Sequence, residues 1–146
     1  MHRLLRLPVL MLSALLLAAA VTAPAGCSAP STPEDTAVRF ITAFADGDLQ
    51  EALELIHFPE HIRRDDTAMG MANGKIMQMV ATGHARIEAK GGLRVITPVD
   101  TAVDTADDGQ ERAAVRLRCE AADGSVSEDV VHLIRINDAW MVDLRV

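Results

Sequence analysis

The stretch TPEDTAVRFITAFADGDLQEA, residues 32–52, carries the signals of two consecutive helices. Thr32 is a typical helix N-cap residue, Pro33 suits the first helical position, and acidic residues fill the first turn. Apolar residues then recur at helical spacing up to a glycine. Gly47 is predicted to end this first helix, and Asp48 is predicted to cap the second. The N-terminal third of the folded part is therefore expected to be helical.

The helical pattern continues beyond this stretch. A third apolar stripe predicts a helix from about Thr67 to Val80, and its methionines are interpreted as core rather than as a binding surface. Gly83 is predicted to end the helical half of the chain. His84–Lys90 is then expected to form a first strand, which ends at the Gly91–Gly92 turn.

The rest of the chain alternates apolar and polar residues, as strands do. Alternation runs over residues 93–104, where Pro98 is expected to bend the strand, and it is clearest over residues 113–120. Cys119 falls on the apolar side of that second strand and is predicted to be a small core residue. The order of helices first and strands second predicts an α+β domain, with three N-terminal helices packed on a curved, mostly antiparallel sheet of four or five strands.

A final hairpin is predicted across Asn137–Asp138. If the turn has two residues, His132 lies opposite Asp143, and the two could form a polar pair in which a general base is oriented by a carboxylate. If the turn has three residues, His132 faces Leu144 and the pair does not form. The alternative interpretation of His132 is a structural histidine in an ordinary hydrogen bond.

The two-residue turn also sorts the apolar residues of the hairpin onto both faces of the sheet. One face would carry Trp140, Val142, Leu144, Val131 and Leu133, and the other Val130, Ile134, Ile136 and Met141. Helices can cover only one of these faces. We therefore expect the sheet to form a homodimer through the other.

The segments 32–52 and 131–143 together resemble the opening and the closing hairpin of the nuclear-transport-factor-2-like superfamily, and in particular its small bacterial lipoproteins of unknown function. The resemblance covers about residues 32–146, with the middle third matched only by the order of its elements. It implies a curved sheet wrapped round a long helix, leaving a cone-shaped cavity that members use as a ligand pocket, as an active site or not at all. It carries no catalytic residue.

The first residues are typical of an export signal. Arg3 and Arg6 precede an apolar run over residues 7–20, and small residues follow. Prolines at both ends of the run make a retained transmembrane anchor the less favoured alternative. We therefore expect the chain to act outside the cytoplasm, in the bacterial cell envelope.

The site of cleavage has two interpretations. Residues 1–26 resemble a lipoprotein signal that ends before a lipidated Cys27, although Pro24 stands where a leucine-like residue is usual. Cleavage after the A-x-A sequence 23–25 would instead release a soluble secreted protein. The favoured interpretation divides the chain into a signal, a lipidated cysteine with a short tether over residues 27–33, and the domain over residues 34–146.

Composition excludes some functions. The chain has 146 residues with a net charge of −7, so a nucleic-acid partner is not expected. It has no tyrosine, so it cannot use the tyrosine hydroxyls on which enzymes resembling ketosteroid isomerase depend. His57 and His61 have the spacing of metal ligands on a helix, but Pro59 lies between them and no third ligand follows; no metal or other cofactor is therefore expected.

These observations leave three candidate functions. The favoured one is a non-enzymatic module, held at the membrane by its lipid, that binds a small apolar ligand or an envelope protein. The second is an envelope enzyme that uses His132 and Asp143 in the cavity. The third is a scaffold subunit whose pocket is filled by its own side chains.

Overall fold

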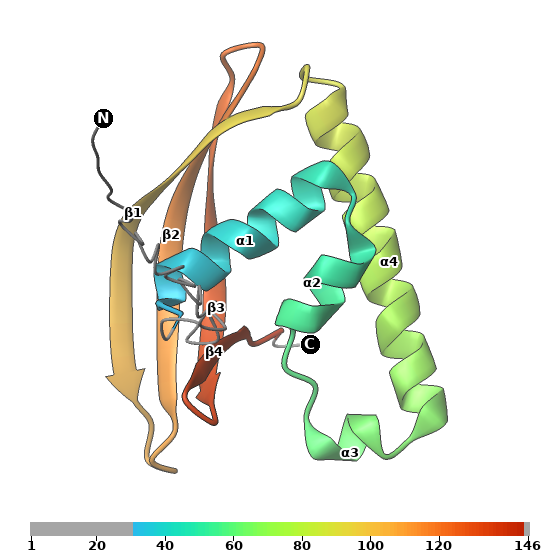
Figure 1. The fold of residues 1–146 in the computed structure, drawn as a ribbon, viewed down its shortest axis with the longest axis vertical. Coiled ribbons are helices and arrows are strands. Elements are labelled where there is room, and N and C mark those ends of the chain that lie inside the picture. Colours follow the sequence, from blue (N-terminus) through green and yellow to red (C-terminus); the bar gives the residue numbers. More distant parts are fainter. Residues whose placement is uncertain (1–30, 145–146) are drawn as a thin grey trace, which may run out of the picture.

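The computed structural model describes residues 31–144. The predicted signal, Cys27 and the first part of the tether lie outside this range. Four helices precede four strands (Figure 1): α1 (Pro33–Asp46), α2 (Leu49–Leu55), α3 (Glu60–Arg63), α4 (Asp66–Glu88), β1 (Leu93–Thr105), β2 (Glu111–Ala121), β3 (Val126–Ile136) and β4 (Ala139–Val142). The α+β class and the segregated order of the elements are as predicted.

The predicted caps of the first two helices are confirmed. The Thr32 hydroxyl accepts a hydrogen bond from the Asp35 N–H at 3.1 Å, and α1 ends at Gly47 in the left-handed conformation, with φ 74°. One residue later the Asp48 carboxylate accepts from the Glu51 N–H at 3.0 Å and starts α2. These caps satisfy backbone groups that the helix ends leave unpaired.

The third predicted helix exists, but its predicted end is wrong. The segment His84–Lys90, predicted to be a strand, is helical up to Glu88, and α4 has 23 residues. Gly83 lies inside this helix, where the lack of a side chain lets α1 approach closely. A Cβ at Gly83 would lie 3.2 Å from Phe44 Cδ1. After the C-cap Ala89 the chain turns toward β1 at Gly91, whose φ is 84°. The short α3 has no counterpart among the predicted elements.

The strands form one antiparallel sheet in the order β1-β2-β3-β4. The register of β1 shifts between Pro98 and Asp100, as the predicted bend requires. At the last hairpin Asn137 and Asp138 both have positive φ, and Ile136 pairs with Ala139. The two-residue turn is therefore the correct alternative of the two.

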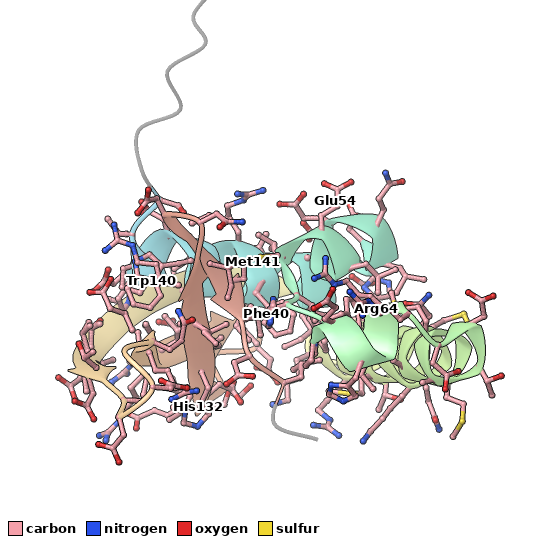
Figure 2. All side chains as sticks on the ribbon, turned by 90° about the horizontal axis from the view of Figure 1, so that it is seen from below. Phe40, Glu54, Arg64, His132, Trp140 and Met141 are labelled. Carbon is pink, nitrogen blue, oxygen red and sulfur yellow. The ribbon has the colours of Figure 1, made fainter. Side chains whose placement is uncertain are left out.

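The core lies between the helices and one face of the sheet. β2 contributes the buried face that its alternation predicts, including Cys119 at 4% exposure, and α1 crosses the sheet with Phe40 turned inward (Figure 2). The core cluster consists of residues from three helices, the loop after α2 and three strands: Ala37, Phe40, Ala43, Ala52, Leu55, Ile56, Ile76, Val80, Ala113, Val115, Leu117, Cys119, Val131, Leu133 and Val142. Within residues 31–144, no helix is both long enough and apolar enough to cross a membrane.

The outer face of the sheet is mixed. Val130 is exposed, Ile134 is buried, and Ile136 and Met141 are half-buried. Arg112 and Arg116 of β2 lie on the same face, opposite Ile134 and Val130. The apolar hairpin face that suggests a homodimer therefore exists but is bordered by charge, and the homodimer stays a prediction.

Candidate ligand cavity

A large open cavity separates the C-terminal part of the sheet from the helices. Its volume is about 1010 Å³. Its walls come from α1, from the segment after α2 including α3, from α4 up to Met79, from β3, and from the residues Val142 to Leu144. Ligand pockets in proteins typically span roughly 300–1,000 Å³. The cavity is therefore large enough for a substantial organic ligand.

The lining is mainly apolar. Its floor is part of the core, with Phe40, Ile56, Ile76, Val131 and Val142 all buried. Half-buried and exposed apolar side chains continue the surface toward the opening: Ile41, Phe58, Ile62, Met71, Met79 and Leu144. Met71, for example, is 73% exposed. Apolar surface that remains open to water in this way is typical of a binding site.

The opening carries charge of both signs. His57, His61 and Lys75 lie on the helical side, whereas Asp129, His132 and Asp143 lie on the side of the sheet. A few polar groups round an apolar pocket are the arrangement that orients a ligand within it. The cavity therefore suits a ligand with a long apolar part and a polar or charged end.

The predicted partners His132 and Asp143 are neighbours across the last hairpin. The Asp143 N–H donates to the His132 carbonyl at 2.8 Å, so the register that places them opposite each other is confirmed. Both residues line the cavity, where His132 is exposed and Asp143 is half-buried. Their action as an acid–base pair stays a prediction.

The two histidines with metal-like spacing do not share a helix. Pro59 is the N-cap of α3, so His57 lies before this helix and His61 lies within it. In the part of the chain that the structure describes, no group of three or more His, Cys, Asp or Glu side chains is placed to hold a metal ion.

Cys119 is unsuited to nucleophilic chemistry. It is buried in β2, and this burial raises the pKa of its thiol; the negative charge of Asp129 raises it further. A reactive cysteine needs an exposed, electropositive setting that stabilises the thiolate. Cys119 is therefore a core residue, as its place in the alternation predicts.

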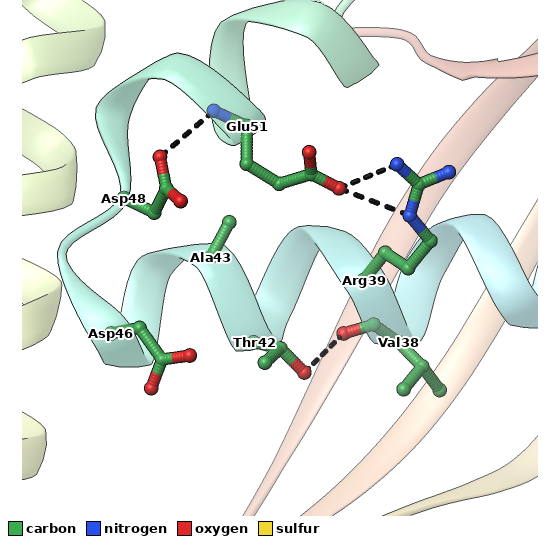
Figure 3. A pocket seen from close by; sticks show the side chains of 7 residues that line it. All are labelled: Val38, Arg39, Thr42, Ala43, Asp46, Asp48 and Glu51. Atoms are coloured by element: carbon green, nitrogen blue, oxygen red, sulfur yellow. Dashed lines mark hydrogen bonds and ion pairs between the residues drawn. The ribbon is translucent and has the colours of Figure 1, made fainter.

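A second, smaller depression of about 170 Å³ lies between α1 and α2 (Figure 3). Two of its charged groups are paired with each other, since Arg39 Nε and Nη2 donate to Glu51 Oε1 at 3.0 and 2.5 Å, and Asp46 also lines it. The Asp48 carboxylate on its rim caps α2. The Arg39–Glu51 pair links α1 to α2, and the depression is much smaller than the cavity described above.

Comparison with solved structures shows which known fold this domain has. A crystal structure from Campylobacter jejuni, described as an NTF2-like transpeptidase in a provisional assignment, matches with a TM-score of 0.69 and 23% sequence identity. The match covers 79% of this chain and 100% of that one. At this identity the likeness establishes the fold alone, which is the nuclear-transport-factor-2-like fold that the sequence resembles. No curated protein matches the chain in sequence.

The family follows from a match over most of the sequence. The model of the family described as Domain of unknown function (DUF4878) matches residues 25–143. The mainly helical first half and the antiparallel second half both fall within this range. The chain is therefore a member of the DUF4878 family, a domain of unknown function with a nuclear-transport-factor-2-like fold.

Proposed function

We propose that this protein is a non-enzymatic binding module that takes up an apolar ligand, or an apolar segment of an envelope protein, in the cavity between α4 and β3. The observation that carries the proposal is the open apolar cavity of about 1010 Å³ with a mixed-charge opening. A scaffold subunit with a self-filled pocket is less well supported, because Phe40, Met71 and Met79 line this space without filling it.

We further propose that Cys27 is lipidated and holds the domain at the outer side of a membrane of the cell envelope. The support is the signal-like sequence of residues 1–26. Intact mass of the native protein extracted from membranes tests this. A chain that begins at Cys27 and carries acyl groups, which are lost in Cys27→Ala, supports the anchor. A chain that begins at Gly26 without lipid identifies a soluble secreted protein instead.

A dye titration tests the cavity. Anilinonaphthalene sulfonate, an apolar dye with one negative charge, should bind with a saturable rise in fluorescence. Ala72 lines the cavity, so Ala72→Trp should occupy part of the volume and reduce dye binding. Ala81 is exposed elsewhere on α4 and does not line the cavity, so Ala81→Trp is the matched control. Equal dye binding by both variants and the wild type would contradict the proposal.

Acid–base catalysis by His132 and Asp143 is the second candidate, favoured by the confirmed register of the hairpin. Small molecules extracted from cell envelopes would be incubated with the wild type and with His132→Gln. A compound that only the wild type consumes would establish an enzyme. Binding without turnover would favour the module.

Transpeptidation, named for the protein from C. jejuni, finds little support in this cavity. Acyl transfer needs a nucleophile, most often a serine, threonine or cysteine. The described residues that line the cavity include none of these types, and Cys119 is buried elsewhere in β2.

We also propose that two copies associate through the outer face of the sheet, where Val130, Ile134 and Met141 lie together. Light scattering at high micromolar concentration tests this, since a monomer would remove the proposal's support.

A further inference from the structure

β3 is much longer than the strand that follows it. β3 extends over 11 residues and β4 over four, and β4 pairs only with residues 133–136 of β3. Figure 1 shows β3 continuing past the end of β4. Beyond that point no strand of residues 31–144 lies on the side of β3 away from β2. The first half of β3 is therefore a sheet edge.

The hydrogen-bond pattern identifies which backbone groups this edge presents. The Asp143 N–H bonds to the His132 carbonyl on the β4 side of β3. In antiparallel pairs the bonded positions alternate along a strand. Val130, Glu128 and Val126 therefore direct their N–H and C=O groups to the same side, where no strand of residues 31–144 pairs with them.

This edge borders the cavity. The residues from Asp129 to His132 are part of its lining. Val130 is 52% exposed and Val126 46%, so the edge is open to solvent. A ligand seated in the cavity thus has hydrogen-bonding backbone beside it as well as apolar side chains. This combination recognises an extended peptide, because backbone bonds supply affinity while pockets select alternate side chains.

Charge decides which peptide fits. Glu128 and Asp129 are adjacent and exposed in the middle of the edge. A second copy pairing antiparallel about this point would set Glu128 against Glu128, and like charges directly opposite each other are destabilising. A segment with lysine or arginine at these two positions is favoured instead.

We propose that the ligand of this domain is an extended peptide segment, apolar at one end and basic in the middle, that adds antiparallel to β3 as a fifth strand. The proposal rests on the proposed function, since it names the ligand class of the same cavity. Apolar residues of the segment lie opposite Val130 and Val131, and basic ones lie opposite Glu128 and Asp129. The antiparallel direction is part of the proposal and continues the pairing of the four strands with one another.

The probe is the fluorescein-labelled hexapeptide Leu-Val-Lys-Lys-Thr-Val, whose residues would face Val131 to Val126 in order. Its first Val and second Lys would direct their N–H groups toward β3, whereas its first Lys and Thr would direct theirs away. N-methylation of the first Val and the second Lys should weaken binding by roughly tenfold or more. N-methylation of the first Lys and the Thr should leave binding nearly unchanged. A peptide with glutamates in place of both lysines should also bind more weakly.

Val130→Pro tests the protein side. Proline removes a donor on the open edge and breaks no bond to β2, because Val130 directs its N–H away from that strand. The matched control is Val103→Pro on β1, the opposite edge, where the valine is similarly exposed and its N–H also points away from the neighbouring strand. Val130→Pro should weaken peptide binding by roughly tenfold or more, and Val103→Pro should not. Thermal unfolding checks that both variants fold.

The outcomes separate this inference from the proposed function. Peptide binding that depends on Val130 and on the predicted amide pattern supports the inference. Equal binding to both proline variants, or indifference to N-methylation, overturns it. If the dye binds and Ala72→Trp excludes it while the peptide fails to bind, the inference is wrong and the proposed function stands. If the dye also fails to bind, the proposed function falls as well. Dimers that Val130→Pro dissociates in the absence of peptide, but that Met141→Lys on the outer face leaves intact, would identify a second copy paired along the edge of β3 and would overturn the peptide proposal.

Discussion

Gly47 is the residue whose replacement should most sharply test the packing of the three longer helices. It ends α1 with φ 74°, and α2 starts two residues later. It also faces α4, since a Cβ at this position would lie 3.1 Å from Cγ of His84. Gly47→Ala therefore introduces two separate penalties, one in the backbone and one in the contact with a neighbouring helix.

The magnitude follows from these two penalties. An L-residue in the left-handed region costs roughly 1–2 kcal/mol. The His84 ring cannot move away freely, because its Nδ1 donates a hydrogen bond to the Ala45 carbonyl at 2.7 Å. Weakening that bond adds about 1 kcal/mol. Gly47→Ala should therefore lower the free energy of unfolding by roughly 2–3 kcal/mol.

Urea unfolding followed by circular dichroism measures this loss. Gly124→Ala is the matched control, because Gly124 has φ 84° and a Cβ at this position would meet nothing within 4 Å. It should lose only the backbone part. In a His84→Ala background, Gly47→Ala should likewise cost no more than Gly124→Ala. If Gly47→Ala and Gly124→Ala lower the free energy of unfolding equally in the wild-type background, the contact between Gly47 and His84 of α4 contributes nothing, contrary to our expectation.

Three further predictions concern other parts of the domain. Gly74→Ala should raise the free energy of unfolding by roughly 0.5–1 kcal/mol in a thermal or urea titration, because Gly74 lies exposed inside α4 with space for a methyl group. The Gln110 N–H and then the Arg112 side chain hold the pKa of Asp108 below its ordinary value of 3.8. The wild type should therefore be more stable than Asp108→Asn at neutral pH, and this difference should disappear as the pH falls through the lowered pKa. NMR of the carboxyl group measures that pKa. In the Cys27→Ala chain, iodoacetamide should label Cys119 only as fast as the domain unfolds, and rapid labelling of the folded protein would contradict its burial.

Local signals in the sequence predict much of the fold. Thr32, Gly47 and Asp48 act within a few residues of themselves, so their roles as caps can be read without tertiary information. The alternation over β2 and the Asn137–Asp138 turn are equally local, and the structure confirms both. The turn then determines the register that places His132 beside Asp143.

Gly83 shows where a prediction from neighbouring residues in the sequence fails. A glycine can end a helix, or it can allow another element to approach closely, and the sequence does not distinguish these roles. Here the glycine accommodates Phe44 of α1, which lies far away in the chain. The helix therefore continues to Glu88 and replaces a predicted strand.

The cavity can be expected only from the resemblance to a family, because its walls come from separate segments. Phe40, Phe58, Met71 and Leu144 each have an ordinary place in a local pattern. Met79 belongs to the apolar stripe that predicts core residues, yet it lines an open cavity. Met71 lies outside that stripe and lines the same cavity. The open edge of β3 depends on where β4 ends, which the continuing apolar pattern beyond Val142 does not reveal.

Methyl NMR of the methionines tests directly whether the cavity is the binding site. Met71 and Met79 line the cavity, Met77 lies exposed on the same helix outside it, and Met141 lies on the outer face of the sheet. On titration with the dye, and separately with the hexapeptide, we expect saturable shifts at Met71 and Met79 with little change at Met77 and Met141. Shifts centred on Met141, or no shift at Met71 and Met79 when a ligand is bound, would contradict this expectation.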